Sequence, residues 1–149
     1  MRIITGDVTD PGLVDGADAP LADLRGRVDL VVSNPPYVPL ATDVDAEVRH
    51  DPHHAVFGGE DGLDVIRPML NIVRELLAPG GAVAIEHDDY SGADVSELLA
   101  GTGFCRDIEV HRDLAGRDRF TTAYRCGDGH RCARHDSTRD TDEGTDHAT

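Results

Sequence analysis

The sequence contains no lysine and no tryptophan, and only 4% of its residues are aromatic. Its positive charge comes from arginine, and 29 acidic residues against 14 basic ones give a formal net charge of −15. A surface this acidic repels phosphate, which disfavours both nucleic-acid binding and attachment to an anionic membrane. With so few aromatic rings, the core of this chain of 149 residues must be built from aliphatic side chains.

Long hydrophobic runs are also missing. No run approaches the roughly 20 apolar residues that cross a bilayer, and the N-terminus reaches Asp7 without the apolar segment of a signal peptide. Three cysteines, an odd number, argue against a complete disulfide framework and suit a reducing compartment. These features predict a soluble, cytoplasmic protein with no membrane partner.

The composition changes near residue 126. Residues 126–149 contain no leucine, isoleucine, valine or phenylalanine, so they bury too little apolar surface to offset their ordering entropy. We expect a folded region over residues 1–125 and a disordered, acidic and polar tail over 126–149. The tail holds four residues of metal-ligating type whose spacing matches no zinc pattern, and we predict no metal site from them: Cys126, His130, Cys132 and His135.

Apolar runs separated by turn signals predict an α/β fold. Val28–Ser33 is a continuous run rich in β-branched residues, typical of a strand buried on both faces of a parallel sheet, and we expect it at the sheet's centre. The pattern is that of the C-terminal half of an open doubly wound, Rossmann-like sheet with a closing antiparallel hairpin. The other expected elements are strands over residues 2–5, 82–86, 104–111 and 120–125, and helices over residues 16–24, 64–77 and 93–100.

Asn34-Pro35-Pro36-Tyr37 directly follows the first long strand, at the end where open α/β sheets bind ligands. Two consecutive prolines make a rigid loop whose carbonyls remain available as acceptors, and Asn34 adds a side-chain carbonyl. Two such acceptors can hold both hydrogens of one planar amino group, while Tyr37 offers a face for stacking. This arrangement suits methyl transfer to an amide or exocyclic amino nitrogen through positioning and preorganised electrostatics. The alternative is a rigid strand exit without a ligand.

The stretch DLVVSNPPYVP, residues 29–39, resembles the signature of amino-group methyltransferases that use S-adenosylmethionine. Those of the HemK/PrmC family methylate the side-chain amide of the glutamine in the GGQ motif of peptide-chain release factors. The resemblance covers residues 25–125. The segments that narrow it to this family are EVR at 47–49, GGEDGLD at 58–64, GG at 80–81, IEH at 85–87 and DLAGRDR at 113–119.

The resemblance implies roles for individual residues. Asn34 and the Pro35 carbonyl would hold the glutamine amide, and Pro36 and Tyr37 would shape its pocket, so that Asn34, Pro35 and Tyr37 are the catalytic candidates. Glu86 ends a strand at the same edge of the sheet. It either lines the substrate pocket or caps a neighbouring loop. The implied partner is a release factor.

The implied cofactor is S-adenosylmethionine, with Asp7 near its adenine and Asn34 beside it. Family members carry a glycine-rich cofactor loop and an acidic ribose partner before the part that this sequence resembles, and the sequence contains neither. We therefore expect a partial methyltransferase domain, truncated at its N-terminus. Two alternatives remain open: an adenine-N6 nucleic-acid methyltransferase, which shares the NPPY motif, and an inactive remnant or binding domain.

Two further clusters receive structural interpretations. His50, His53 and His54 lie in a polar stretch and are expected to be solvated loop residues. The run GGEDG at residues 58–62 could cradle phosphate, but its two acids would repel it. We predict a flexible turn there, with Glu60 and Asp61 placed favourably near the positive end of the following helix.

Overall fold

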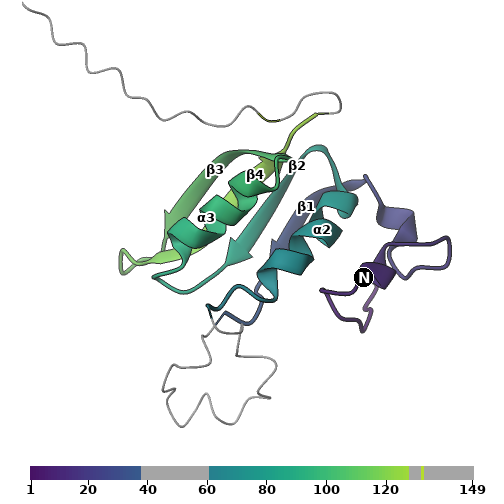
Figure 1. The fold of residues 1–149 in the computed structure, drawn as a ribbon, viewed down its shortest axis with the longest axis horizontal. Coiled ribbons are helices and arrows are strands. Elements are labelled where there is room, and N and C mark those ends of the chain that lie inside the picture. The colour runs from purple at the N-terminus through teal and green to yellow at the C-terminus, as the bar shows by residue number, and fades with distance from the viewer. Residues whose placement is uncertain (38–60, 128–131, 133–149) are drawn as a thin grey trace, which may run out of the picture.

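The computed structural model describes residues 1–37, 61–127 and 132, which form a mixed four-stranded sheet with two α-helices on one face (Figure 1). The α/β class predicted from the sequence is confirmed. The elements in chain order are η1 (Pro11–Leu13), η2 (Ala22–Leu24), β1 (Val28–Ser33), α2 (Ile66–Leu76), β2 (Leu77–Glu86), α3 (Gly92–Gly101), β3 (Cys105–Arg112) and β4 (Asp118–Arg125).

β1 occupies one edge of the sheet, whose strand order is β1-β2-β4-β3. It pairs in parallel with β2, while β4 runs antiparallel to both of its neighbours. The bounds of β1 and its parallel pairing are confirmed, but the prediction of a central position is wrong. Residues 2–5, which were expected to form another strand, have no regular structure, and no strand of the described part pairs with the outer side of β1.

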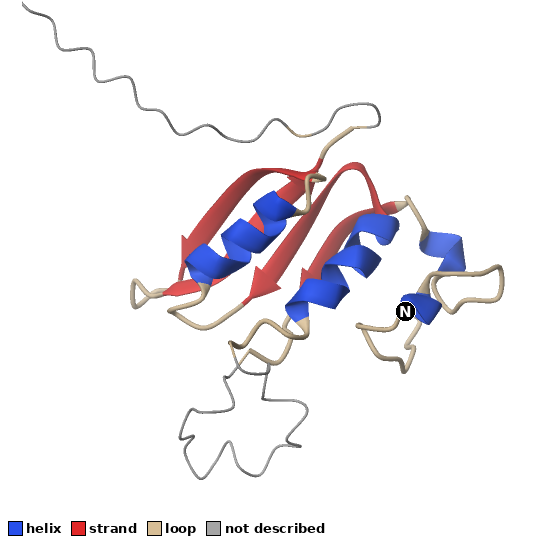
Figure 2. Ribbon diagram, viewed as in Figure 1, coloured by secondary structure: helices blue, strands red, loops and turns tan. Residues whose placement is uncertain are grey.

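The two faces of the sheet differ sharply. α2 and α3 lie on one face of the sheet (Figure 2). Val83 and Ile85 belong to the core on that face, and Val31 packs against it. The alternating residues Leu30 and Val32 point the other way, and they are 57% and 72% exposed. The prediction that β1 is buried on both faces is therefore wrong, because the described helices cover only one of them.

α2 forms because its apolar residues recur at helical spacing. Ile66, Met69, Leu70 and Val73 are all buried against the sheet. Pro68 lies in the first turn, where a missing N–H costs nothing, as predicted.

β2 follows α2 directly and begins at Leu77, five residues before the predicted start at Ala82. Pro79 and Gly80 are therefore part of the strand segment and not a separate loop. Gly81 allows β1 and β2 to approach at this end, since a Cβ there would lie 2.8 Å from the Val28 carbonyl oxygen.

The C-terminal elements match the prediction closely. α3 stops before Gly103, which has a φ of 69° and so takes a backbone conformation that favours glycine. The turn between β3 and β4 is held by the Asp113 carboxylate, which accepts hydrogen bonds from the backbone N–H groups of Ala115 and Arg117 at 2.8 and 3.0 Å. The Arg117 N–H, followed by the Arg117 guanidinium and the Ala115 N–H, holds the pKa of Asp113 below its usual value.

Residues 1–27 form an irregular segment beside α2. The helix predicted over residues 16–24 is wrong, because only the short η2 forms there. Hydrogen bonds from the Gly26 and Arg27 N–H groups to the carbonyls of Glu75 and Leu76, together with an Arg25–Glu75 ion pair at 2.6 Å, tie the segment to the end of α2. No helix of the described residues has the length and apolar character needed to cross a membrane.

Candidate active site

The carboxyl ends of β1 and β2 bring Asn34 and Glu86 to the same edge of the sheet. Ser33 is paired with Ile85, so the next residues, Asn34 and Glu86, follow side by side. β4 starts at this edge, and its Phe120 is paired with Glu86. By strand alternation all three belong to the face opposite the helices. Phe120 was not among the predicted site residues, because the hairpin register that places it beside Glu86 is not visible in the sequence.

The NPPY loop is anchored by its prolines and presents its asparagine. Pro35 is buried, Pro36 and Tyr37 are half-buried, and Asn34 is exposed. Just before the loop, the Ser33 hydroxyl donates to the sulfur of Met69 at 3.2 Å, which attaches the end of β1 to α2. The backbone around Asn34 is therefore held, while its side-chain amide remains accessible to a ligand.

Glu86 is half-buried, and no ion pair among the described residues includes its carboxylate. The loop that follows β2 is capped by a different acid. One carboxylate oxygen of Asp88 accepts from the N–H groups of Tyr90 and Ser91, at 2.9 and 2.8 Å. With that role taken by Asp88, lining the substrate pocket remains our prediction for Glu86.

A buried histidine lies directly behind this edge. The Nδ1 of His87 donates to the Asp88 carbonyl at 2.7 Å, and its Nε2 lies 2.9 Å from the Thr121 hydroxyl, which donates to it in the neutral ring. Both side chains are fully buried. His87 thus joins the end of β2 to β4. The IEH run is visible in the sequence, but the burial of its histidine is not predicted by it.

Two aromatic rings lie beside Glu86 at this edge of the sheet. The rings of Phe120 and His111 stack with centroids 4.7 Å apart and planes 15° from parallel. His111 is fixed in turn by a hydrogen bond of 2.7 Å between its Nε2 and the Thr122 hydroxyl. Asn34, Glu86, Phe120 and His111 therefore form a polar-to-aromatic row across all four strands, which we call the edge row.

Asp7, predicted to contact the cofactor, lies in the irregular N-terminal segment. Its carboxylate accepts hydrogen bonds from the N–H and the hydroxyl of Thr9, at 2.8 and 2.7 Å. These bonds hold the pKa of Asp7 below its usual value. None of the hydrogen bonds found among the described residues joins Asp7 to the NPPY loop, so its contact with the cofactor remains a prediction.

Two of the predicted site segments have little or no described structure. EVR at 47–49, His50, His53, His54 and residues 58–60 lie outside the described residues. Asp61 is described, and it accepts from the Leu63 N–H at 3.0 Å and pairs with Arg67 near the start of α2. The guanidinium of Arg67 and this N–H lower the pKa of Asp61.

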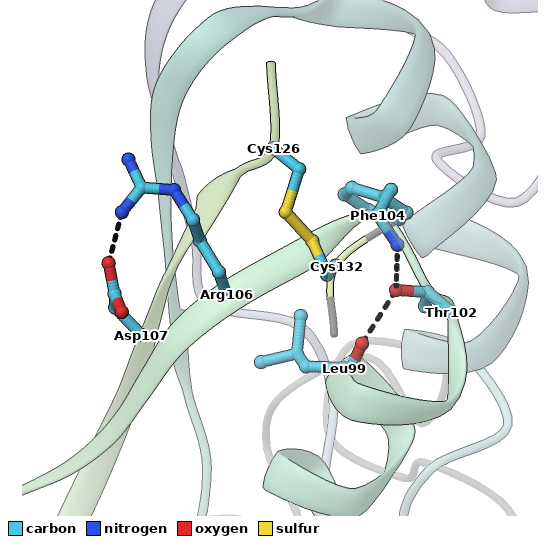
Figure 3. Close-up of a disulfide and its surroundings, with 7 residues drawn as sticks. All are labelled: Leu99, Thr102, Phe104, Arg106, Asp107, Cys126 and Cys132. Carbon is cyan, nitrogen blue, oxygen red and sulfur yellow. Dashed lines mark hydrogen bonds and ion pairs between the residues drawn. A yellow bond between two sulfur atoms is a disulfide. The ribbon is translucent and has the colours of Figure 1, made fainter. Parts of the chain in front are cut away.

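Cys126 and Cys132 are joined by a disulfide with their Cα atoms 6.0 Å apart (Figure 3). The third cysteine, Cys105, is free and buried, so the cysteines do not form a complete disulfide framework, as the odd count indicates. The bond forms next to the end of β4, where the Cys126 N–H donates to the Phe104 carbonyl at 2.8 Å. No cluster of three metal-ligating side chains occurs among the described residues.

The described residues of the edge row line neither of two hollows found in the described part of the chain. A hollow of about 660 Å³ lies between α2 and α3, on the opposite side of the sheet. Another, of about 420 Å³, lies within the N-terminal segment. Neither is lined by residues 34–37. The arrangement of Asn34 and Glu86 can meet a planar amino group from solvent, but the described residues do not enclose it.

Comparisons with known proteins give a consistent result. No family model matches the chain. A release factor glutamine methyltransferase from Corynebacterium glutamicum is 51% identical over 123 residues, which is 83% of this chain and 42% of the relative. Proteins of the same name from Mycobacterium tuberculosis and Deinococcus radiodurans are 44% identical over 128 residues and 46% identical over 109 residues, or 85% and 72% of this chain.

The chain spans about two fifths of the length of these relatives, in their C-terminal part. A solved structure of a proposed DNA modification methylase from Thermus thermophilus covers 87% of this chain and 56% of its own, at 20% identity and a TM-score of 0.46. That likeness is too distant to bear on function.

Proposed function

We propose that this chain carries the acceptor side of a site for methyl transfer to a glutamine amide. The chain belongs by sequence to the release factor glutamine methyltransferases (HemK/PrmC). The observation that carries this proposal is the position of Asn34, exposed at the end of a parallel strand and followed by a buried Pro35. The kinship supports the choice of acceptor, because the relatives are named for that substrate.

Methyl transfer to an amide nitrogen at this edge of the sheet needs positioning of the amide and no strong base. The nitrogen of an amide is a weak nucleophile because its lone pair is delocalised. The Asn34 side-chain oxygen and the Pro35 carbonyl would accept one hydrogen each from the substrate –NH₂ group and fix its plane. As the nitrogen gains a methyl group it becomes positively charged, and these acceptors stabilise that charge more strongly than the neutral amide. The proton can then leave without a strong base.

Neighbouring side chains assist this arrangement. The Glu86 carboxylate, adjacent to Asn34, is placed to favour positive charge at the edge row and to line the pocket. Tyr37 offers a flat surface against which the amide plane packs. His87 acts indirectly, by holding the exit of β2 through its bond to Thr121. It is a positioning residue.

The methyl donor in this proposal is S-adenosylmethionine, which supplies a methyl group bound to a positively charged sulfur. The described residues fit the cofactor only in part. The Glu86 carboxylate suits a cation, but the sequence before Val28 contains no glycine-rich D-x-G-x-G-x-G turn. All the roles proposed above therefore concern the glutamine amide, which accepts the methyl group, and none concerns binding of the cofactor.

A protein substrate agrees with the charge of the chain. A net charge of −15 opposes the approach of DNA or RNA, whose backbones carry a negative charge at every phosphate, and suits a protein substrate better. It thus disfavours the adenine-N6 alternative. Because release factors act during translation, we also propose a cytoplasmic location.

The test is methyl transfer by a chimaera in which the unmatched N-terminal part of the Corynebacterium glutamicum relative precedes this chain. Incubated with S-adenosylmethionine and a bacterial release factor, it should add one methyl group to the glutamine of the GGQ motif, detected by mass spectrometry of the tryptic peptide. A release factor with that glutamine replaced by alanine, and an adenine-containing DNA duplex, are the controls. Methylation of the duplex in place of the release factor would support the alternative.

A further inference from the structure

Two loops at the carboxyl end of the parallel strands expose large apolar side chains. Tyr90, in the loop between β2 and α3, is 87% exposed, and Leu114, in the turn between β3 and β4, is fully exposed. We call these two residues the loop pair. Single exposed apolar residues are common on protein surfaces. The loop pair differs from them because each residue stands on a loop with a fixed backbone and because the two loops are neighbours.

Hydrogen bonds fix the backbone of both loops. The Asp88 carboxylate accepts from the Tyr90 N–H at 2.9 Å. On either side of Leu114, the Asp113 N–H donates to the Arg117 carbonyl at 2.8 Å and closes the turn. A side chain on a backbone held in this way costs little conformational entropy when a partner covers it. The loop pair is therefore preorganised for contact with another molecule.

The two loops lie side by side at one end of the sheet (Figure 1). At the start of the first loop, the His87 N–H donates to the Arg119 carbonyl of β4 at 3.0 Å. At its end, a Cβ added to Gly92 would lie only 3.1 Å from a methyl group of Val110 on β3. Both ends of this loop thus contact the β3–β4 hairpin close to its turn. The loop pair belongs to one continuous surface.

This end of the sheet also carries the acceptor edge. β2 ends at Glu86 and leads into the loop of Tyr90, and the turn of Leu114 leads into β4, whose Phe120 is paired with Glu86. With strands about 4.8 Å apart, the end of the sheet measures about 14 Å from β1 to β3. A protein that presents a glutamine to Asn34 is wider than this, so it would also meet the loop pair.

The turn beside Leu114 is balanced in charge, unlike the chain as a whole. Arg112 pairs with Asp118 at 3.0 Å, and Arg117 pairs with Asp113 at 2.9 Å. With these arginines paired, the turn offers an apolar tip and not a cationic patch, which favours apolar contact with a protein. Tyrosine, the other member of the loop pair, is among the residue types enriched in protein interfaces.

We propose that the loop pair, Tyr90 and Leu114, is a docking surface for the protein substrate, in contact with a part of the release factor outside its GGQ motif. The two side chains hold the substrate against the acceptor edge and take no part in methyl transfer. The inference rests on the proposed function, because it takes a release factor as the substrate.

The first test is calorimetric titration of a bacterial release factor with the intact 149-residue chain. The wild-type chain should bind saturably, and the double variant Tyr90→Ser, Leu114→Ser should bind at least about tenfold more weakly. Both side chains are exposed, so the substitutions leave the core unchanged. Tyr90→Phe with Leu114→Met keeps the apolar surface and should retain the affinity. Ile3→Ser is the matched control, because Ile3 is 82% exposed in the N-terminal segment, and it should bind as the wild type does.

The second readout separates docking from chemistry. In the chimaera, the serine double variant should raise KM for the release factor about tenfold and leave kcat unchanged. Methylation of a short peptide that contains only the GGQ motif should not change, because this peptide lacks the part of the release factor that would contact the loop pair.

Three results would overturn the proposal. One is the absence of saturable binding by the wild-type chain. The second is equal binding by the serine double variant and the wild-type chain. The third is a homodimer of this chain, seen by light scattering and abolished by the serine double variant, since it would assign the loop pair to a second copy.

The two tests distinguish this inference from the proposed activity. Weakened binding by the serine double variant, with a chimaera that methylates no release factor, would support the docking surface and refute the activity. An active chimaera in which the double variant leaves KM for the release factor unchanged would support the activity and refute the docking surface.

Discussion

His87 and Thr121 are fully buried, and the Nε2 of the histidine lies 2.9 Å from the threonine hydroxyl. The pair joins the last residues of β2 to β4 immediately behind Glu86. A ring nitrogen with no access to water depends on this hydroxyl for its hydrogen bond. The orientation of the Glu86–Asp88 segment therefore rests on a contact inside the core.

Thr121→Val should remove that hydroxyl while keeping the side chain's shape. It leaves the His87 nitrogen buried without a partner, at a cost of about 1–3 kcal/mol in the free energy of unfolding. Urea denaturation of the 149-residue chain measures it. Thr122→Val, the same substitution one residue along and on the half-buried face, should cost clearly less. An equal loss in the free energy of unfolding at both positions would show that the buried hydrogen bond stabilises the fold no more than the half-buried one.

The Cys105 thiol should be almost inert in the folded chain. Burial raises its pKa from an ordinary value of 9.0 to about 11, so the thiolate fraction near pH 8 falls about a hundredfold relative to an ordinary thiol. Alkylation by iodoacetamide should be slow until denaturant is added. After reduction, Cys126 and Cys132 serve as the internal comparison and should react faster. Rapid labelling of Cys105 in the native chain would contradict its burial.

The same shift has a consequence for stability. In the unfolded chain the thiol loses its proton at a lower pH than in the folded chain, so the unfolded state binds fewer protons between about pH 9 and 11. The contribution of Cys105 to stability is complete below pH 9 and declines as the pH rises towards 11. Cys105→Ala should remove this part of the alkaline decline in urea midpoints.

The chain alone should bind S-adenosylmethionine very weakly. The described residues provide the acceptor edge, but the sequence lacks the glycine-rich turn that brings backbone N–H groups close to such a ligand. Isothermal titration of the purified 149-residue chain should show no saturable binding at micromolar concentrations. The chimaera with the N-terminal part of the relative is the positive control. Low-micromolar binding by the chain alone would mean that its own residues complete the cofactor site.

Local patterns in the sequence predicted most of the fold. The bounds of β1, the periodicity of α2 and the hairpin around Asp113 depend on residues close in the chain. The wrong predictions concern the packing of elements that are distant in the sequence. An apolar run such as VDLVVS indicates a strand, but it cannot tell whether anything covers Leu30 and Val32. The strand and the helix predicted in the N-terminal segment are wrong. Its apolar patterns are short, and the segment is held by contacts with the end of α2 instead.

The candidate site divides in the same way. Asn34, Pro35 and Glu86 were identified because strand ends in an α/β sheet attract ligands and because their residue types suit the chemistry. Phe120 and His111 were missed, since their place in the edge row depends on the pairing of β4 with β2 and β3. The disulfide was missed because the odd cysteine count says nothing of which pair lies close in space.

The role of the NPPY loop is decided by the turnover of Asn34→Ala in the chimaera, with a GGQ-containing release factor as substrate. We expect a loss of about 10²–10³-fold in kcat, with the affinity for S-adenosylmethionine unchanged, because Asn34 is assigned to the acceptor amide. Asn71→Ala is the matched control, since Asn71 is exposed on α2 away from the edge row, and it should retain full turnover. Unchanged turnover by Asn34→Ala would contradict the role given to this residue and to the NPPY loop.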